Sequence, residues 1–144
     1  MKRRTSRLLS ILLALCLALA LLPGTVWAAG SGTCGENATW TLDENGRLTI
    51  SGTGRIDPPE SFYEDWGGFV KTIEVGEGIT ELGVAVFEFG GSATKATLPE
   101  TLTKIGADAF YLESDLEEIN IPSKVTEIGE GAFFGCKKQT GQKT

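Results

Sequence analysis

The pattern of apolar and polar residues repeats three times between Val70 and Lys138, with a period of 23 residues and no insertion. The copies occupy residues 70–92, 93–115 and 116–138. A repeat of this length predicts a solenoid, because a single unit cannot bury its apolar face alone and must stack on its neighbours. The residues that share a position in successive copies are Ile73, Ala96 and Ile119; Val75, Leu98 and Ile121; Ile79, Leu102 and Val125; Leu82, Ile105 and Ile128; Gly83, Gly106 and Gly129; and Phe87, Phe110 and Phe133.

Each copy predicts two short extended segments separated by a turn. Apolar and polar residues alternate at 73–75 and at 119–121, which is the period-two signal of a β-strand. Pro99 and Pro122 should end this strand, because proline cannot donate the next ladder hydrogen bond. A second strand or extended turn follows at 125–128. The turn after Gly129 should form a short helical or 3₁₀ segment at Ala132 and Phe133.

Three further sets of recurring side chains predict contacts between neighbouring coils. Stacked rings should make an aromatic column of Phe87, Phe110 and Phe133. Hydroxyl groups should form a ladder of Thr80, Thr103 and Thr126. Charges of alternating sign recur at Glu81, Lys104 and Glu127, and each exposed pair should contribute about 0.2–1 kcal/mol.

Residues 39–69 predict a cap on the first coil. Apolar residues alternate at 39–42 and at 47–50, with Asn45 and Gly46 between them, which is a strong β-hairpin signal. A lone hairpin is marginal in water, so its apolar face should dock on the first coil. We expect Gly52–Gly54 to end the second strand.

An irregular loop is expected from Ile56 to Gly68, with the aromatic residues Phe62, Tyr63 and Trp66. Two interpretations are open for these rings. They can form a platform on which a sugar stacks, or they can cover the apolar end of the solenoid. We favour cap packing, because aromatic burial is strongly stabilising. The preceding residues 29–38 are mostly small and predict a linker.

The N-terminal segment predicts export. Basic residues at positions 2–7 precede the 15-residue apolar run Leu8–Leu22, and small residues follow at Val26 and Ala28. This order is typical of a signal peptide at residues 1–28, cleaved after Ala28. A run of this length is shorter than the roughly 20 residues that cross a bilayer, so we expect no membrane span after cleavage. The protein is predicted to be secreted or held at the cell surface.

The net charge and the absence of histidine exclude several kinds of partner and of catalytic site. Without residues 1–28 the chain keeps 9 basic and 19 acidic residues, a formal charge of −10, which disfavours nucleic acid and anionic lipid as partners. The sequence has no histidine, which removes Ser-His and Cys-His catalysis and histidine-ligated metals. Cys34 and Cys136 flank the array at opposite ends and should stay unpaired. We predict no cofactor and no metal site.

One enzymatic alternative survives these exclusions. Carboxylates near the aromatic loop could serve a glycosidase, which needs two of them at a defined separation. Acidic loop residues are more often simply solvated, so we predict a protein that is not an enzyme. The carboxylates concerned are Asp57, Glu60, Glu64 and Asp65.

The third copy follows the pattern Leu116-x-x-Ile119-x-Ile121-Pro122-x-x-Val125-Thr126-x-Ile128-Gly129-x-x-Ala132-Phe133-x-x-Cys136. The second copy keeps most of this pattern, and the first keeps its apolar skeleton. The pattern resembles the BspA-like leucine-rich repeat, and the segment from Cys34 to Trp66 resembles the lead-in found before such repeats. The resemblance implies a mainly β solenoid of three coils with a hairpin cap. It also implies a secreted or surface bacterial protein, since several members are adhesins that bind host matrix proteins.

A partner surface is expected on the outward positions of the first strand in each coil. The candidate residues are Thr72, Glu74, Lys95, Thr97, Glu118 and Asn120. We interpret them as contacts for a protein partner such as a host matrix or surface protein. The alternative is that they form only a solvated face, as most exposed polar residues do.

The repeat pattern stops at the polar tail 139–144, where Gln139 takes a position at which the pattern needs an aliphatic residue. The underside of the third coil is therefore expected to be open, although natural solenoids usually cover such an end. Two interpretations follow. The chain self-associates through this end, or it is the N-terminal structural spacer of a larger modular surface protein.

Overall fold

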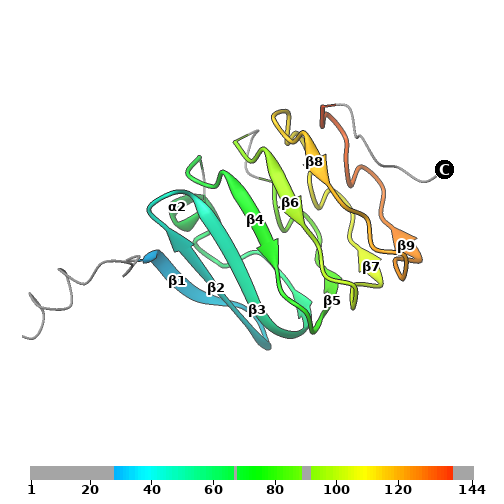
Figure 1. Ribbon diagram of the computed structural model, residues 1–144, viewed down its shortest axis with the longest axis horizontal. Coiled ribbons are helices and arrows are strands. Elements are labelled where there is room, and N and C mark those ends of the chain that lie inside the picture. The colour runs from blue at the N-terminus through cyan, green and yellow to red at the C-terminus, as the bar shows by residue number, and fades with distance from the viewer. Residues whose placement is uncertain (1–27, 67, 89–91, 138–144) are drawn as a thin grey trace, which may run out of the picture.

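The computed structural model describes residues 28–66, 68–88 and 92–137, and the predicted signal peptide and polar tail lie outside this part of the chain, apart from Ala28. In the described residues, nine strands form one twisted sheet with a single turn of helix beside it (Figure 1). The elements are β1 (Ala28–Gly35), β2 (Asn37–Asp43), β3 (Arg47–Ile56), α2 (Phe62–Asp65), β4 (Thr72–Val75), β5 (Ile79–Leu82), β6 (Lys95–Thr97), β7 (Lys104–Ile105), β8 (Glu118–Ile119) and β9 (Glu127–Ile128).

The three repeats stack as the coils of a parallel β-solenoid. Strands β4, β6 and β8 form one parallel ladder, and β5, β7 and β9 form the other. Partners lie one repeat apart, as Ile73 pairs with Ala96 and Ala96 with Ile119. The fold predicted from the 23-residue period is confirmed.

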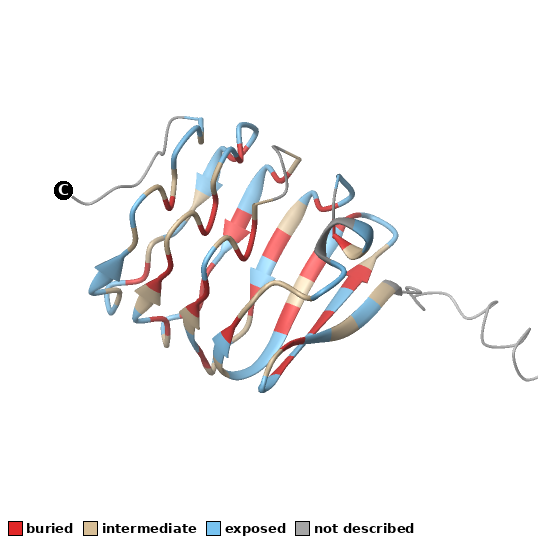
Figure 2. Cartoon of the chain, turned by 180° about the vertical axis from the view of Figure 1, so that it is seen from behind, coloured by how far each residue is buried: buried red, intermediate tan, exposed pale blue. Residues whose placement is uncertain are grey.

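An aromatic column runs through the interior from the cap to the third coil. Trp40 meets Trp66 edge-on, with ring centroids 5.7 Å apart, and Trp66 stacks on Phe87 at 6.1 Å. Phe87 and Phe110 follow at 5.3 Å, and Phe110 and Phe133 at 5.4 Å. Buried positions alternate with exposed ones along the strands that enclose this column (Figure 2). The predicted phenylalanine stack is confirmed, and two tryptophans extend it into the cap.

The aromatic segment after β3 acts as a cap through Trp66, whose side chain is fully buried. The prediction of cap packing is confirmed for this residue, which leaves Trp66 inaccessible as a platform for a sugar. Residues 62–65 form the single-turn helix α2 where we expected an irregular loop. Its backbone is closed by the N–H groups of Glu64 and Asp65, which both donate to the Ser61 carbonyl at 2.9 Å.

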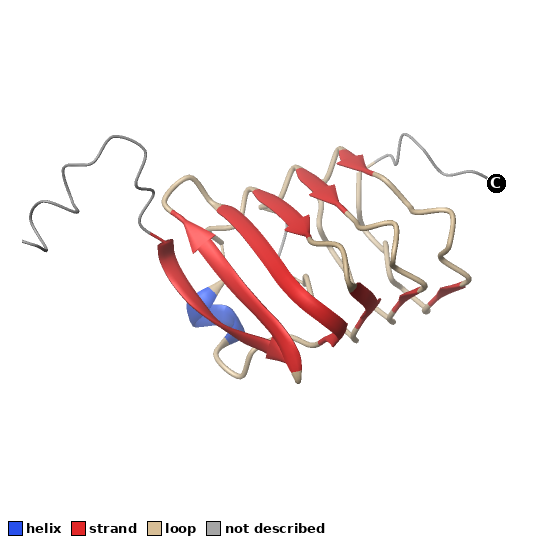
Figure 3. Ribbon diagram, turned by 60° about the horizontal axis from the view of Figure 1, so that its bottom comes forward, coloured by secondary structure: helices blue, strands red, loops and turns tan. Residues whose placement is uncertain are grey.

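Strand β3 belongs to both parallel ladders. Its first half pairs with β4, where Arg47 is opposite Thr72, and its second half pairs with β5, where Arg55 is opposite Glu81. Figure 3 shows the long strands of the cap beside the short strand pairs of the coils. Our expectation that Gly52–Gly54 end this strand was wrong. Gly52 and Gly54 have φ of 121° and 82°, and these left-handed conformations redirect the strand without ending it.

The predicted linker at residues 29–38 was wrong, because this segment is β1 and the start of β2, paired antiparallel. The small residues have a packing role. A Cβ atom at Gly30 would lie 3.1 Å from the Trp40 ring, and one at Gly32 would lie 2.8 Å from the indole nitrogen. Only residues without side chains let the outer strand cross this ring so closely, so a composition that suggested mobility instead serves close contact.

Glycines set the distance between successive coils at the turn after the second strand. A Cβ atom at Gly106 would lie 2.7 Å from main-chain atoms of Gly83 and Leu82, a distance that side chains do not tolerate. The turn that follows in the third coil holds Ala132 and Phe133, and it is a hydrogen-bonded turn without the helix we expected. There the carbonyl of Ala132 accepts the N–H of Phe110 at 2.8 Å, which ties the second coil to the third.

The third coil is the least buried. Ile128 is 51% exposed, whereas its counterparts Leu82 and Ile105 are fully buried. Ile119, Ile121, Val125, Phe133 and Cys136 are only partly buried as they pack against the core. Among the described residues no further coil covers these side chains, and the polar tail that follows lies outside this part of the chain.

Truncation of the stacked phenylalanine to alanine should cost different amounts of stability in the second and third coils, because the ring is fully buried in one and partly exposed in the other. Phe110→Ala should lower the free energy of unfolding by about 3–5 kcal/mol, because it removes a fully buried ring. Phe133→Ala should cost clearly less, because this ring is partly exposed. Urea unfolding followed by circular dichroism measures both. Equal losses would mean that the end of the third coil is covered in solution.

Candidate interaction surface

The six residues predicted as a partner surface lie on the same side of the β4–β6–β8 ladder. Their register follows from the strand pairing, since Thr72 is opposite Lys95 and Lys95 is opposite Glu118. The side chains between them point into the core, as the alternating burial of β4 and β6 shows. The structure therefore places Thr72, Glu74, Lys95, Thr97, Glu118 and Asn120 together on one outward face, which we call the β4–β6–β8 face.

A shallow depression of about 410 Å³ lies between β6 and β8 on this part of the molecule. Four of the predicted residues line it, together with the small side chain of Ala96 and with Ile119. Ala96 occupies a strand position at which the first and third coils have isoleucine. The predicted residues that line the depression are Lys95, Thr97, Glu118 and Asn120.

The charges on this face pair with each other. The ammonium group of Lys95 lies 2.8 Å from the Glu118 carboxylate, and the Arg47 guanidinium lies 3.7 Å from the carboxylate of Glu74. The hydrogen bond and charge of Glu118 raise the pKa of Lys95. Such exposed pairs contribute little to stability, but they fix where positive and negative charge stand on the surface.

Arg47 also belongs to this face, although the hairpin pattern alone predicts only a cap. The second strand of the hairpin lies in register with the first strand of the first coil. A signal was present, because Arg47-Leu48-Thr49-Ile50 has the same polar–apolar order as Thr72-Ile73-Glu74-Val75. The structure pairs these two segments residue by residue.

Asn120 has a structural role that the sequence did not reveal. Its Oδ1 accepts the main-chain N–H of Leu98 at 2.9 Å, and its Nδ2 donates to the Leu98 carbonyl at 3.0 Å. The amide thus replaces a strand residue in the ladder and joins the third coil to the second. Asn120 lines the depression, but its amide hydrogen-bonds within the fold.

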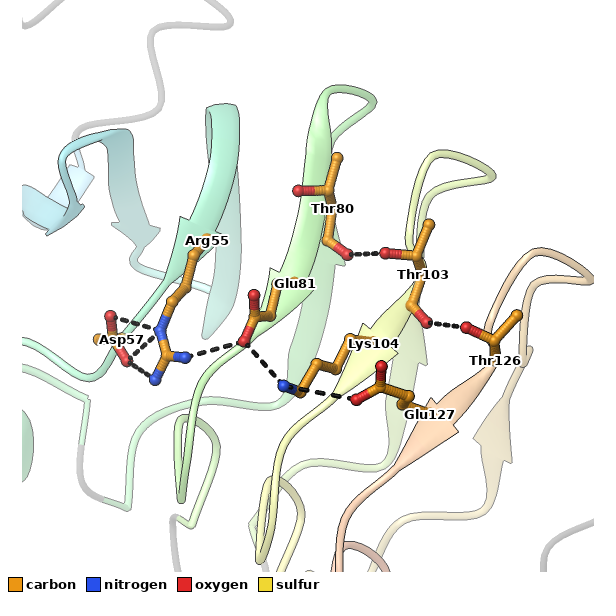
Figure 4. Close-up of polar contacts among 8 residues, drawn as sticks. All are labelled: Arg55, Asp57, Thr80, Glu81, Thr103, Lys104, Thr126 and Glu127. Carbon is orange, nitrogen blue, oxygen red and sulfur yellow. Dashed lines mark hydrogen bonds and ion pairs between the residues drawn. The ribbon is translucent and has the colours of Figure 1, made fainter.

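The opposite ladder, β5–β7–β9, carries a second row of charges that continues onto β3 (Figure 4). The Arg55 guanidinium lies 2.8 Å from the Glu81 carboxylate, and Lys104 follows 3.6 Å from Glu81 and 3.5 Å from Glu127. The predicted alternation of charge is confirmed. The cap extends it by one cation, since Arg55 also binds Asp57 through Nε and Nη2, and this raises the pKa of Arg55.

The threonine column beside these charges forms the ladder between neighbouring coils that the sequence predicted. The Thr103 hydroxyl donates to the main-chain carbonyl of Thr80 at 3.1 Å, and the Thr126 hydroxyl donates to that of Thr103 at 3.5 Å (Figure 4). Each hydroxyl therefore bonds to the neighbouring backbone and not to the next hydroxyl. The ladder reinforces the strand register of β5, β7 and β9.

The carboxylates of the enzymatic alternative lie around the cap. Asp57 is held by Arg55, and Asp65 accepts a hydrogen bond from the Ser61 hydroxyl. Asp57, Glu60 and Asp65 line a shallow depression of about 480 Å³ beside Trp40. In residues 28–137, where the structure describes them, no cluster of three or more acidic, histidine or cysteine side chains is arranged to hold a metal ion.

Cys34 and Cys136, the two cysteines in the part of the chain that the structure describes, are free thiols, as predicted. Burial, followed by the charge of Asp57, raises the pKa of Cys34 to about 11, so this thiol is protonated at neutral pH. Cys136 is half-buried and donates its S–H to the Phe110 carbonyl at 3.0 Å. A protonated thiol is a poor nucleophile, so both residues act as small packing groups.

These features define a class of protein: a capped parallel β-solenoid with polar ladders on its outer faces. A family model for the BspA type leucine rich repeat region matches residues 60–140, and the chain belongs to this family. Repeats of this family fit a protein-binding module. In the part of the chain that the structure describes, no helix has the length and apolar character needed to cross a bilayer.

The fold is also similar to that of a leucine-rich repeat protein from Eubacterium ventriosum ATCC 27560, known from a crystal structure. The TM-score is 0.57 at 24% sequence identity, over 75% of this chain and 36% of that one. The chain therefore spans about a third of the length of that protein. No curated protein matches the sequence.

The amide of Asn120 provides a test of how the third coil is attached. Asn120→Ala should lower the free energy of unfolding by about 1–2 kcal/mol, because it removes two hydrogen bonds to Leu98. Thr97→Ala, the corresponding change in the second coil, should stay within about 0.5 kcal/mol, since its side chain is exposed. Chemical unfolding of the two variants compares them directly, and equal effects would refute a structural role for the amide.

Proposed function

We propose that the protein is exported and acts as a non-enzymatic, adhesive protein-binding module, secreted or at the cell surface. The observation that supports it best is the β4–β6–β8 face, where fixed charges surround a shallow depression on a rigid scaffold. Its partner is a protein, and host matrix or surface proteins are the class that the leucine-rich repeat suggests. A flat polar face of this kind is suited to a protein surface and offers no enclosed site for a small molecule.

The arrangement of charge supports binding of a specific partner and not nonspecific association. Positive Arg47 and Lys95 alternate with negative Glu74 and Glu118 across neighbouring strands. A partner with the complementary pattern gains attraction at each position, whereas a partner of one uniform sign meets repulsion at every second strand. The depression between β6 and β8 offers a place for one projecting side chain of the partner.

Non-enzymatic action is supported by the chemistry of the cap. The chain contains no histidine, and two of the four carboxylates considered for glycosidase chemistry, Asp57 and Asp65, are already engaged with Arg55 and Ser61. An activity on polysaccharides that disappears in Glu64→Gln would contradict this part of the proposal.

Binding to matrix proteins tests the proposed face. The chain without residues 1–28 should be retained on immobilised extracellular-matrix proteins above an unrelated acidic protein. Lys95→Ala/Glu118→Ala should weaken binding about tenfold or more, because it removes a charge pair beside the depression without leaving either charge unpaired. Lys124→Ala, in an exposed turn between β8 and β9, is the control. Equal retention of all three proteins would place binding elsewhere, and no retention would refute the proposal.

Export has its own test. The protein recovered from the medium or the cell surface should begin at Ala29, as determined by mass spectrometry of its N-terminus. Leu13→Arg/Leu17→Arg should keep the protein inside the cell at full length, because two charges interrupt the apolar run. Export of this variant at the level of the unchanged chain would contradict the predicted signal peptide.

A further inference from the structure

The indole N–H of Trp40 is a buried hydrogen-bond donor in the cap. Its side chain is 3% exposed, and no acceptor from the described residues lies within hydrogen-bond distance of the nitrogen. Buried tryptophan N–H groups usually find a partner, because an unpaired donor away from water costs free energy. The N–H of Trp40 therefore marks a position at which an acceptor from another molecule would bind favourably.

This N–H lies at the wall of the depression of about 480 Å³ that β1 and residues 57–61 line together. Trp40 and Gly32 are both lining residues, and a Cβ atom at Gly32 would lie 2.8 Å from the indole nitrogen. Because glycine stands at this point, no side chain at position 32 covers the nitrogen. A ligand in the depression can therefore reach this donor.

Negative charge lines the same depression. Three carboxylates, those of Asp57, Glu60 and Asp65, belong to its lining, and no lysine or arginine is among the described residues that line it. Arg55 neutralises Asp57 by binding both of its oxygens (Figure 4). Asp65 accepts a hydrogen bond from Ser61, which positions the carboxylate but leaves its charge. Glu60 is exposed and has no ion pair within the described part of the chain. The lining therefore keeps two negative charges that a cation would offset.

Two prolines give this depression a rigid apolar surface. Pro58 and Pro59 are half-buried lining residues with a fixed φ and no N–H group. The aliphatic part of a long basic side chain packs well on such a surface while its charged end reaches a carboxylate. Arginine fits this arrangement best, because its five N–H donors form a planar fork that can bind two carboxylates at once. A peptide carbonyl beside it supplies the acceptor that Trp40 needs.

We propose that the depression beside Trp40 binds an arginine residue of a partner protein. The guanidinium group pairs with Glu60 and Asp65, and a main-chain carbonyl next to that arginine accepts the indole N–H. A sugar could use the same N–H, but its neutral hydroxyl groups would leave the two carboxylates without a counter-charge. This site is separate from the β4–β6–β8 face and does not depend on it.

The indole signal of Trp40 in ¹⁵N–¹H NMR spectra reports binding directly. The chain without residues 1–28 keeps two tryptophans, and Trp66, which is fully buried in the core, serves as the internal reference. The probe is a capped peptide Gly-Gly-Arg-Gly-Gly, and its control carries citrulline, which has the shape of arginine but no charge. The arginine peptide should shift the Trp40 signal as it binds. Its affinity should be about tenfold higher than that of the citrulline peptide, since hydrogen bonds between charged groups are the stronger ones.

Charge removal at the site should weaken binding more than charge removal elsewhere. Glu60→Gln/Asp65→Asn should lower the affinity for the arginine peptide about tenfold or more, because both charged partners of the guanidinium are lost. Glu100→Gln/Glu130→Gln is the matched control, since it removes the same net charge from exposed positions outside the depression. Trp40→Phe identifies the Trp40 signal by removing it. This variant should weaken binding about three- to tenfold, the effect of one hydrogen bond.

Melting temperatures show whether Trp40→Phe keeps the fold, and the charge variants decide the question if it does not. No shift of the Trp40 signal with the arginine peptide would overturn the proposal, even if maltotriose or calcium ions moved that signal, since the occupant would then be a sugar or a metal ion. Equal affinity for the citrulline peptide, or equal losses in the two charge variants, would also overturn it. Lys95→Ala/Glu118→Ala should leave the shift unchanged, which separates this site from the β4–β6–β8 face.

Discussion

The close stacking of one coil on the next is the interaction on which the rest of this structure depends. Parallel strands lie about 4.8 Å apart, and at Gly106 the backbones approach until no side chain fits between them. Every other feature uses this fixed spacing: flat aromatic rings stack inside, hydroxyls reach the neighbouring carbonyl, and opposite charges meet outside. No coil could hold its shape alone, so stability is shared between neighbours and is lowest where a neighbour is missing.

The 23-residue period allowed correct predictions of which residues become neighbours in successive coils. Predictions were wrong for features that the period does not determine. A repeat of 23 residues without insertion determines which residues become neighbours, so the aromatic column and the Glu81–Lys104–Glu127 row could be foreseen. Residues 29–38 lie outside the repeat, and their small side chains suggested a linker because composition alone does not show what a glycine packs against. Asn120 looked like an exposed polar residue, because a hydrogen bond to the Leu98 backbone depends on how far β8 extends and not on residue type.

The candidate surface was predicted as a set of positions, but the distribution of positive and negative charge on it became clear only from the strand pairing. Parallel register places Lys95 beside Glu118 and Arg47 near Glu74, so the face is patterned and close to neutral although the chain as a whole is acidic. Long-range attraction by net charge therefore contributes little at this face, and recognition depends on short-range complementarity. The acidic excess of the chain therefore lies outside this face.

The double membership of β3 has a mechanical consequence. Because this one strand is hydrogen-bonded to both β4 and β5, the cap holds the first coil through two ladders, whereas the strands of the third coil have two residues each. A force that pulls on the C-terminal end would peel the coils away one at a time, breaking a few hydrogen bonds in each step, while the cap stayed folded. On release, the cap and first coil would serve as the template on which the others wind back. The molecule would then behave as an extensible tether that lengthens in steps of one repeat.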